Sequence, residues 1–239
     1  MLKYILLILV GFGGGFVQRV SGFGLGIFVM MFLPYFLPSH TAAASVSCLF
    51  SCVTSTYNAI RYRKSVSYKT ALPLLIAALV TIPVAVGFAT YVSAGVFQIL
   101  LGVVLILLSL YFLLFNNKIR ILPTVGNGVL AGAIGGTLNG LFSTGGPPVV
   151  LYLTQALSDN LTYFATIQFY FCITNIYATV SRAFSGVINL QVLICAAVGM
   201  IGCMAGDWLG KRVFDKLDAG KLRKIIYIGM IISGLIMIF

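Results

Sequence analysis

Long apolar runs follow one another along the chain, separated by short segments that carry most of the charged residues. The runs are about as long as, or longer than, the roughly 20 residues that a helix needs to cross a bilayer. The pattern predicts apolar helical segments at residues 2–36, 42–60, 71–91, 94–115, 125–157, 163–184, 192–210 and 222–239. No stretch between them could hold a soluble domain, so we predict one all-α polytopic membrane domain over residues 1–239.

The first and fifth runs are longer than one crossing requires. Residues 2–36 would extend about 50 Å as one straight helix, against a hydrocarbon core of about 30 Å. This run contains VSGFGLGIF (20–28), and each glycine inside a helix costs about 1 kcal/mol. The fifth run contains FSTGGPPVV (142–150), where two prolines signal a helix start because proline lacks the N–H that a first turn leaves unpaired. We therefore predict breaks, with new helices beginning near Gly26 and near Pro147.

The two halves of the chain resemble each other. With a shift of 121 residues, residues 11–67 align without a gap on the second half at ten identities, among them four glycines and the pair Arg61 and Arg182. Near the end, SAGVFQILLG also matches DAGKLRKIIY at a shift of 125. We predict a duplication, with repeat one at residues 1–118 and repeat two at residues 119–239.

The distribution of basic residues predicts how these repeats are oriented. If both broken segments turn back, residues 61–69, 118–120 and 211–224 fall on one side, which then holds twelve of the fifteen Lys and Arg. The positive-inside rule makes that side cytoplasmic and puts the N-terminus outside. Each half then has a broken segment, re-entrant or a hairpin of short helices, plus three spanning helices. An odd number of crossings makes the repeats inverted, as in many secondary transporters.

Interrupted helices at matching positions of two halves are the best sequence pointer to a binding site near the membrane midplane. Each half-helix N-terminus carries free N–H groups and a partial positive charge, which suits an anion, and glycines let the backbone approach it closely. Polar and basic residues nearby complete the site. The candidate substrate-binding residues are Gln18, Arg19, Ser21, Gly22, Phe23, Gly24, Gly26, Arg61, Asn139, Ser143, Thr144, Gly145, Gly146, Pro147, Gln168, Asn175 and Arg182.

Several of these candidates have a second interpretation. The arginines could attract or clamp an anion, or their side chains could snorkel to the membrane interface. Gln168 and Asn175, on one helix face at i,i+7, could instead join two helices by hydrogen bonds. Cys48 and Cys52 share a face at i,i+4, and such residues serve either as small buried hydrophobes or in thiol chemistry.

The composition argues against several functions. The net charge of +11 does not indicate nucleic-acid binding, because the basic residues are scattered through short loops. The chain has no glutamate and four aspartates, and it lacks paired carboxylates, a metal-ligand motif and a Walker loop. We therefore expect no enzymatic activity, no metal site and no cofactor. The expected partners are a small anion and the lipid bilayer, with a homodimer left open.

At the two glycine-rich breaks the sequence resembles the TauE/SafE family of sulfite exporters. The resemblance rests on the motifs SGFGLG in the first half and STGGPPVVLY in the second. The first motif has Leu25 where a further glycine is common. The resemblance covers essentially the whole chain. It implies transport of sulfite or organosulfonates, as export across the bacterial inner membrane. An anion channel and a membrane thiol or redox protein remain the alternatives.

Overall fold

The structure, a computed structural model, describes residues 2–115, 122–213 and 219–239, and these are helical, without a strand. The repeat boundary expected at 118/119 and the basic residues 118–120 lie outside this part of the chain. The elements in order are α1 (Leu2–Ser21), α2 (Leu25–Met30), η1 (Leu33–Tyr35), α3 (His40–Arg61), η2 (Arg63–Ser65), α4 (Tyr68–Tyr91), α5 (Ala94–Phe115), α6 (Val125–Phe142), α7 (Gly146–Ala156), α8 (Asn160–Phe184), α9 (Leu190–Val213) and α10 (Ala219–Ile238).

Both predicted breaks are present, and each has a local cause. Between α1 and α2, Gly22 and Gly24 have φ angles of 79° and 107°, in the left-handed region that glycine enters without a steric penalty. Between α6 and α7, Ser143 has a φ of 56°. The α7 helix then starts with proline in its first turn, as the sequence predicted.

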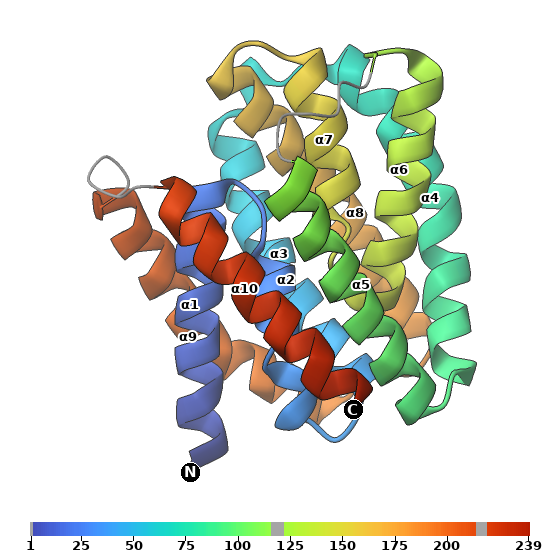
Figure 1. Ribbon diagram of the computed structural model, residues 1–239, viewed down its shortest axis with the longest axis vertical. Helices are drawn as coiled ribbons and strands as arrows, with labels where there is room; N and C mark the ends of the chain where they lie inside the picture. Colours follow the sequence, from blue (N-terminus) through green and yellow to red (C-terminus); the bar gives the residue numbers. More distant parts are fainter. Residues whose placement is uncertain (1, 116–121, 214–218) are drawn as a thin grey trace.

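At each break the chain turns back on itself. A Cβ placed on Gly13 of α1 would overlap the ring of Phe28 in α2, so the shorter helix packs against the longer one. In the second half, the aromatic ring of Tyr152 in α7 packs in the same way against Gly128 of α6. Figure 1 shows α1 rising from the N-terminus at the lower left, with α2 below its upper end. A single tilted helix over residues 2–36 is therefore excluded.

The long helices pair across the two halves of the chain. The α1 helix packs along α9, and α6 packs along α4, while α3 contacts α8 and α5 contacts α10. Glycines make the first two contacts close. A Cβ on Gly11 would overlap the backbone of Gly199, and one on Gly132 would overlap the backbone of Leu74. Small residues spaced four apart commonly bring helix backbones together in membranes, where no hydrophobic force drives helices to associate.

The surface of the bundle is apolar and its interior is partly polar. On α4, Ile76, Val80 and Val84 are 57%, 66% and 71% exposed. Among the described residues, four helices could cross a membrane by length and composition: Leu2–Val20, Tyr68–Tyr91, Ala94–Leu114 and Leu190–Arg212. The α3 and α8 helices are as long, but they bury serine, threonine, asparagine and glutamine side chains between them, which lowers their hydropathy.

The described basic ends of the helices lie toward one end of the molecule. In Figure 1 the connection between α3 and α4, which holds Arg63 and Lys64, is at the top, and the basic C-terminal end of α9 is also in the upper half. The N-terminus is at the bottom. This grouping agrees with two broken segments that turn back.

Helix starts on the described connections are capped by side chains. The side-chain oxygens of Ser39, Thr124 and Asp159 each accept a hydrogen bond from the backbone N–H three residues further on. The Thr162 hydroxyl and N–H, both donating to Asp159, lower the pKa of that exposed carboxyl below its ordinary value. These caps confirm that α3, α6 and α8 start where the polar segments meet the apolar runs.

Glycine packing along α9 yields a stability prediction. A Cβ on Gly206 would overlap the carbonyl oxygen of Phe12 in α1, whereas one on Gly87 of α4 meets no atom within 4 Å. Gly206→Ala should destabilise the protein by about 1–3 kcal/mol through overpacking, and Gly87→Ala should leave stability unchanged or raise it by up to about 1 kcal/mol. Thermal unfolding of both variants in one detergent measures this, and equal melting temperatures would contradict the packing role.

Candidate functional site

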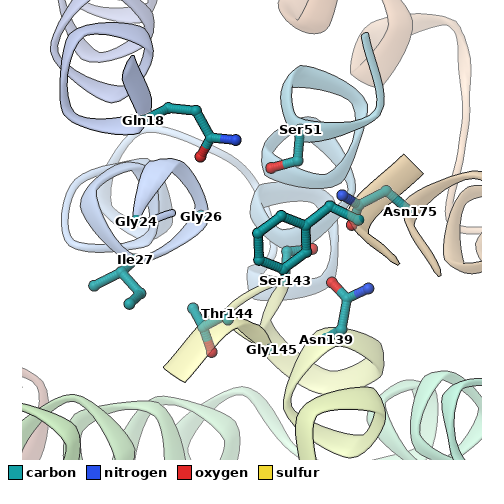
Figure 2. A pocket seen from close by; sticks show the side chains of 12 residues that line it. Gln18, Gly24, Gly26, Ile27, Ser51, Asn139, Ser143, Thr144, Gly145 and Asn175 are labelled. Atoms are coloured by element: carbon teal, nitrogen blue, oxygen red, sulfur yellow. The ribbon is translucent and has the colours of Figure 1, made fainter. Parts of the chain in front are cut away.

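A small cavity lies where the two breaks meet. Its volume is about 30 Å³, roughly twice the volume that one ordered water requires. Residues of six helices, α1, α2, α3, α6, α7 and α8, and of both breaks line it (Figure 2). The lining residues are Gln18, Gly24, Gly26 and Ile27 from the first break, Asn139, Ser143, Thr144, Gly145 and Gly146 from the second, Ser51 from α3, and Phe171 and Asn175 from α8.

Direct backbone contact joins the two breaks. A Cβ on Gly26 would overlap the carbonyl oxygen of Ser143, so only glycine lets α2 come this close to the second break. Gly145 packs equally tightly against the carbonyl oxygen of Gly135 in its own hairpin. At these two positions the glycine admits another part of the backbone, in addition to any role toward a ligand.

The starts of α2 and α7 supply different sets of donors. In α2, the Leu25 N–H donates to the Gln18 side chain at 3.3 Å, while the N–H groups of Gly26 and Ile27 belong to a first turn without intrahelical acceptors. In α7, Pro147 and Pro148 have no N–H, which leaves Gly146 as the donor in the first helical positions. The positive end of α7 therefore acts more through its dipole than through many hydrogen bonds.

Two buried polar side chains of the lining have unused hydrogen-bonding capacity. Asn139 is 4% and Thr144 is 2% exposed, and neither the Asn139 Nδ2 nor the Thr144 Oγ1 has a partner among the described residues. A buried polar group without a partner costs about 1–3 kcal/mol. By contrast, the Ser143 hydroxyl donates to the Ala44 carbonyl oxygen at 2.7 Å. The free amide and hydroxyl suit a ligand that accepts hydrogen bonds.

None of the three candidate arginines lines this cavity. Arg19 donates to the Oδ1 of Asn58 at 3.4 Å, and exposed Arg61 donates to the Tyr57 hydroxyl at 3.1 Å. Arg182 is 3% exposed, so it does not snorkel, and its Nη2 donates to the carbonyl oxygens of Asn139 and Gly140 at 2.8 and 2.9 Å. Arg182 thus holds the backbone that ends α6.

The remaining candidates surround the cavity without lining it. Gln168 donates from Nε2 to the Gly22 carbonyl oxygen at 2.9 Å, so it joins α8 to the first break as the interhelical interpretation predicted. Phe23 packs against the ring of Phe112, with centroids 5.7 Å apart. Pro147 is buried and does not line the cavity, and the side chain of Ser21 is outside the described part of the structure.

Sequence reasoning missed three lining residues, Ile27, Ser51 and Phe171. Ser51 belongs to a series of buried serines at Ser47, Ser51 and Ser55, spaced four apart on one face of α3. That spacing was a usable signal of a polar face directed into the bundle. Ile27 and Phe171 carry no such signal, because apolar residues are abundant throughout the chain.

Comparison with known proteins agrees with this architecture. The family model described as "Sulfite exporter TauE/SafE" matches residues 7–237, which is nearly the whole chain. The chain belongs to the TauE/SafE family. It is 25% identical over 219 residues to the "Probable sulfite/organosulfonate exporter TauE" of Cupriavidus necator, covering 90% of this chain and 85% of that protein. No solved structure matches.

TauE/SafE membership agrees with an apolar helical membrane protein and with description as an exporter rather than an enzyme. The five cysteines are free thiols. Within the described residues, no group of three or more His, Cys, Asp or Glu side chains is placed to hold a metal ion.

The bond from Gln168 to the first break yields a second prediction. Gln168→Leu leaves the buried Gly22 carbonyl oxygen without this donor and should destabilise the protein by about 1–3 kcal/mol. Gln155→Leu, at an exposed position of α7, is the matched control and should change stability little. Chemical or thermal unfolding in detergent tests the pair, and an unaffected Gln168→Leu variant would show that the bond does not hold the break.

Proposed function

We propose that this protein transports small sulfur-containing anions, sulfite or organosulfonates, and exports them across the bacterial inner membrane. Membership of the TauE/SafE family and the printed name of the relative support the substrate class. The observation that carries the proposal is the cavity between the breaks. Its lining offers unpartnered donors and no carboxylate, a combination suited to an anion.

In this proposal the anion lies between the starts of α2 and α7, near the membrane midplane. Each start contributes a partial positive charge of up to about +0.5. The Asn139 amide and the Thr144 hydroxyl supply direct hydrogen bonds, and the Ser51 hydroxyl completes the polar side of the cavity. The cavity, at about 30 Å³, has room for little more than water, so in this proposal it widens toward one side at a time to take up and release the anion.

We further propose that the two halves are inverted repeats, residues 1–118 and 119–239. The pairing of α1 with α9 and of α6 with α4 supports this, because each pair joins the first α-helix of one half to the fourth α-helix of the other. The contacts also correspond. In the first pair of helices Gly11 meets Gly199, and in the second Gly132 meets Leu74. Gly11 and Gly132 are 121 residues apart, and Leu74 and Gly199 are 125 residues apart. These separations are the two shifts of the internal alignment.

Two other functions remain as alternatives to a transporter. An anion channel needs a continuous pore, and the small volume of the cavity favours a carrier. A thiol or redox protein would use Cys48 and Cys52. The Cys48 thiol lies 3.5 Å from the carbonyl oxygen of Asn175, in the packed interface of α3 and α8, which favours a structural role. A homodimer in the lipid bilayer is compatible with each of these functions.

A lining hydroxyl gives the direct test of transport. Thr144→Val preserves side-chain volume and removes the unpartnered hydroxyl, so the variant should fold and bind sulfite about tenfold more weakly, the effect of one lost hydrogen bond to a charged ligand. Thr154→Val, at an exposed hydroxyl of α7, is the matched control. Counterflow of sulfite and of organosulfonates in proteoliposomes measures transport. Absence of flux for every sulfur anion with the parent protein would refute the function.

Orientation is predicted with the N-terminus outside and the basic ends of α3 and α9 in the cytoplasm. In a cysteine-free background, Ser93→Cys should react with a membrane-impermeant maleimide in intact cells, while Lys64→Cys and Arg212→Cys should react only after lysis. All three positions are exposed in the structure. Labelling of Lys64→Cys and Arg212→Cys from opposite sides would disprove the shared basic side, and retained transport in the cysteine-free parent would eliminate the redox alternative.

A further inference from the structure

The guanidinium of Arg182 lies against the carbonyl end of α6, immediately before the second break. Its Nη2 donates to the carbonyl oxygens of Asn139 and Gly140, and its Nη1 has no hydrogen-bond partner among the described residues. Asn139 also lines the cavity with its side chain. A charged group is therefore bound to the backbone of a residue whose side chain lines the proposed binding site.

Helix dipoles oppose each other at this break. The α6 helix ends at Phe142 with its negative pole, and α7 begins at Gly146 with its positive pole. An anion between them would meet the carbonyl groups of α6 as well as the positive end of α7. A cation at the carbonyl end of α6 offsets the repulsion between the anion and these carbonyl groups, and Arg182 occupies that position.

No carboxylate compensates this charge within the described structure. Asp159 caps the opposite end of α8, 23 residues from Arg182 and so about 35 Å along the helix. Asp207 lies on α9 and interacts with Arg19, Lys211 and Arg61. The titratable side chain that interacts with Arg182 is the thiol of Cys48 on α3. The positive charge therefore acts on the cavity without an acidic partner.

The two repeats differ at this point. Arg61 occupies the aligned position of repeat one, but it is exposed and donates to Tyr57. At the first break the Gly22 carbonyl oxygen is bonded by the neutral amide of Gln168. The buried charge thus acts at the second break, where the unpartnered Asn139 amide and Thr144 hydroxyl also lie.

We propose that Arg182 determines the charge selectivity of the cavity without contacting the ligand: it cancels the negative end of α6 and adds its own field, which favours divalent over monovalent anions. This inference rests on the proposed function, because it assigns the group that selects the substrate class. Coulomb energy is proportional to ligand charge. If loss of the guanidinium charge lowers the affinity for a monovalent anion by a given factor, it should therefore lower the affinity for a divalent anion by the square of that factor.

The test uses the purified full-length protein and one ligand in two charge states, bisulfite at acidic pH and sulfite at alkaline pH. Arg182→Gln should weaken bisulfite binding about tenfold and sulfite binding about a hundredfold, the size of a unit charge acting over on the order of 10 Å at an effective dielectric constant of about 20. Arg182→Lys keeps the charge and should retain the parent's ratio of the two affinities. Arg63→Gln, an exposed arginine of η2, should change neither affinity.

A second pair of variants keeps the hydrogen bonds of Arg182 intact. Thr90 borders the small cavity beside Arg182 and is exposed, so Thr90→Glu adds a counter-charge there and Thr90→Gln is its neutral match. Thr90→Glu should weaken sulfite more than bisulfite, and Thr90→Gln should not. The proposed role of Arg182 in charge selectivity would be overturned if the variants lost equal affinity for bisulfite and for sulfite. It would also be overturned if Arg182→Gln and Thr90→Glu left both affinities unchanged. A parent protein that binds neither form would instead refute the proposed function.

Discussion

The structure depends on one contact, the close approach of the two broken segments where the Gly26 backbone meets the Ser143 carbonyl group. Non-helical backbone at membrane depth persists only when protein or a wet cavity satisfies its polar groups. The side chains around the breaks meet this requirement. Gln18 accepts from the Leu25 N–H, Gln168 donates to the Gly22 carbonyl oxygen, and Arg182 donates to the end of α6. The polar faces of α3 and α8 thus exist where the broken backbone needs partners.

That same requirement explains why the helices differ in polarity and in position within the bundle. The helices with the most apolar surfaces, α4 and α5, present large hydrophobic residues outward, and the more polar α3 and α8 are packed against each other inside. Between helices in lipid, close packing replaces the hydrophobic effect as the source of stability. Glycines on α1, α6 and α9 provide it, since any side chain at Gly11, Gly132 or Gly206 would overlap the neighbouring backbone. Some glycines of the chain therefore make breaks, and others join helices.

Much of the fold followed from local sequence signals. The starts of α2 and α7 fell at Leu25 and Gly146, within a residue of the predicted positions, because glycine and proline act on the backbone at their own place in the chain. The role of Arg182 could not be predicted, because its acceptors are carbonyl oxygens 42 and 43 residues away and every residue carries a carbonyl. Gln168 and Asn175 share a helix face, yet only Asn175 reaches the cavity, since Gln168 is occupied by Gly22. Contacts between distant elements arise in the tertiary structure, and the periodicity of the sequence does not predict them.

The chemistry of the lining also constrains how binding responds to pH. The cavity is formed by glycine, serine, threonine, asparagine, glutamine, isoleucine and phenylalanine, none of which titrates near neutral pH. The helix ends contribute fixed dipoles, and an arginine guanidinium stays protonated throughout the physiological range. The electrostatic field in the cavity is therefore constant while the charge of a ligand such as sulfite changes with pH. A proton that accompanies the anion through this site must be carried by the anion itself, because the residues that line the site have no group to receive it.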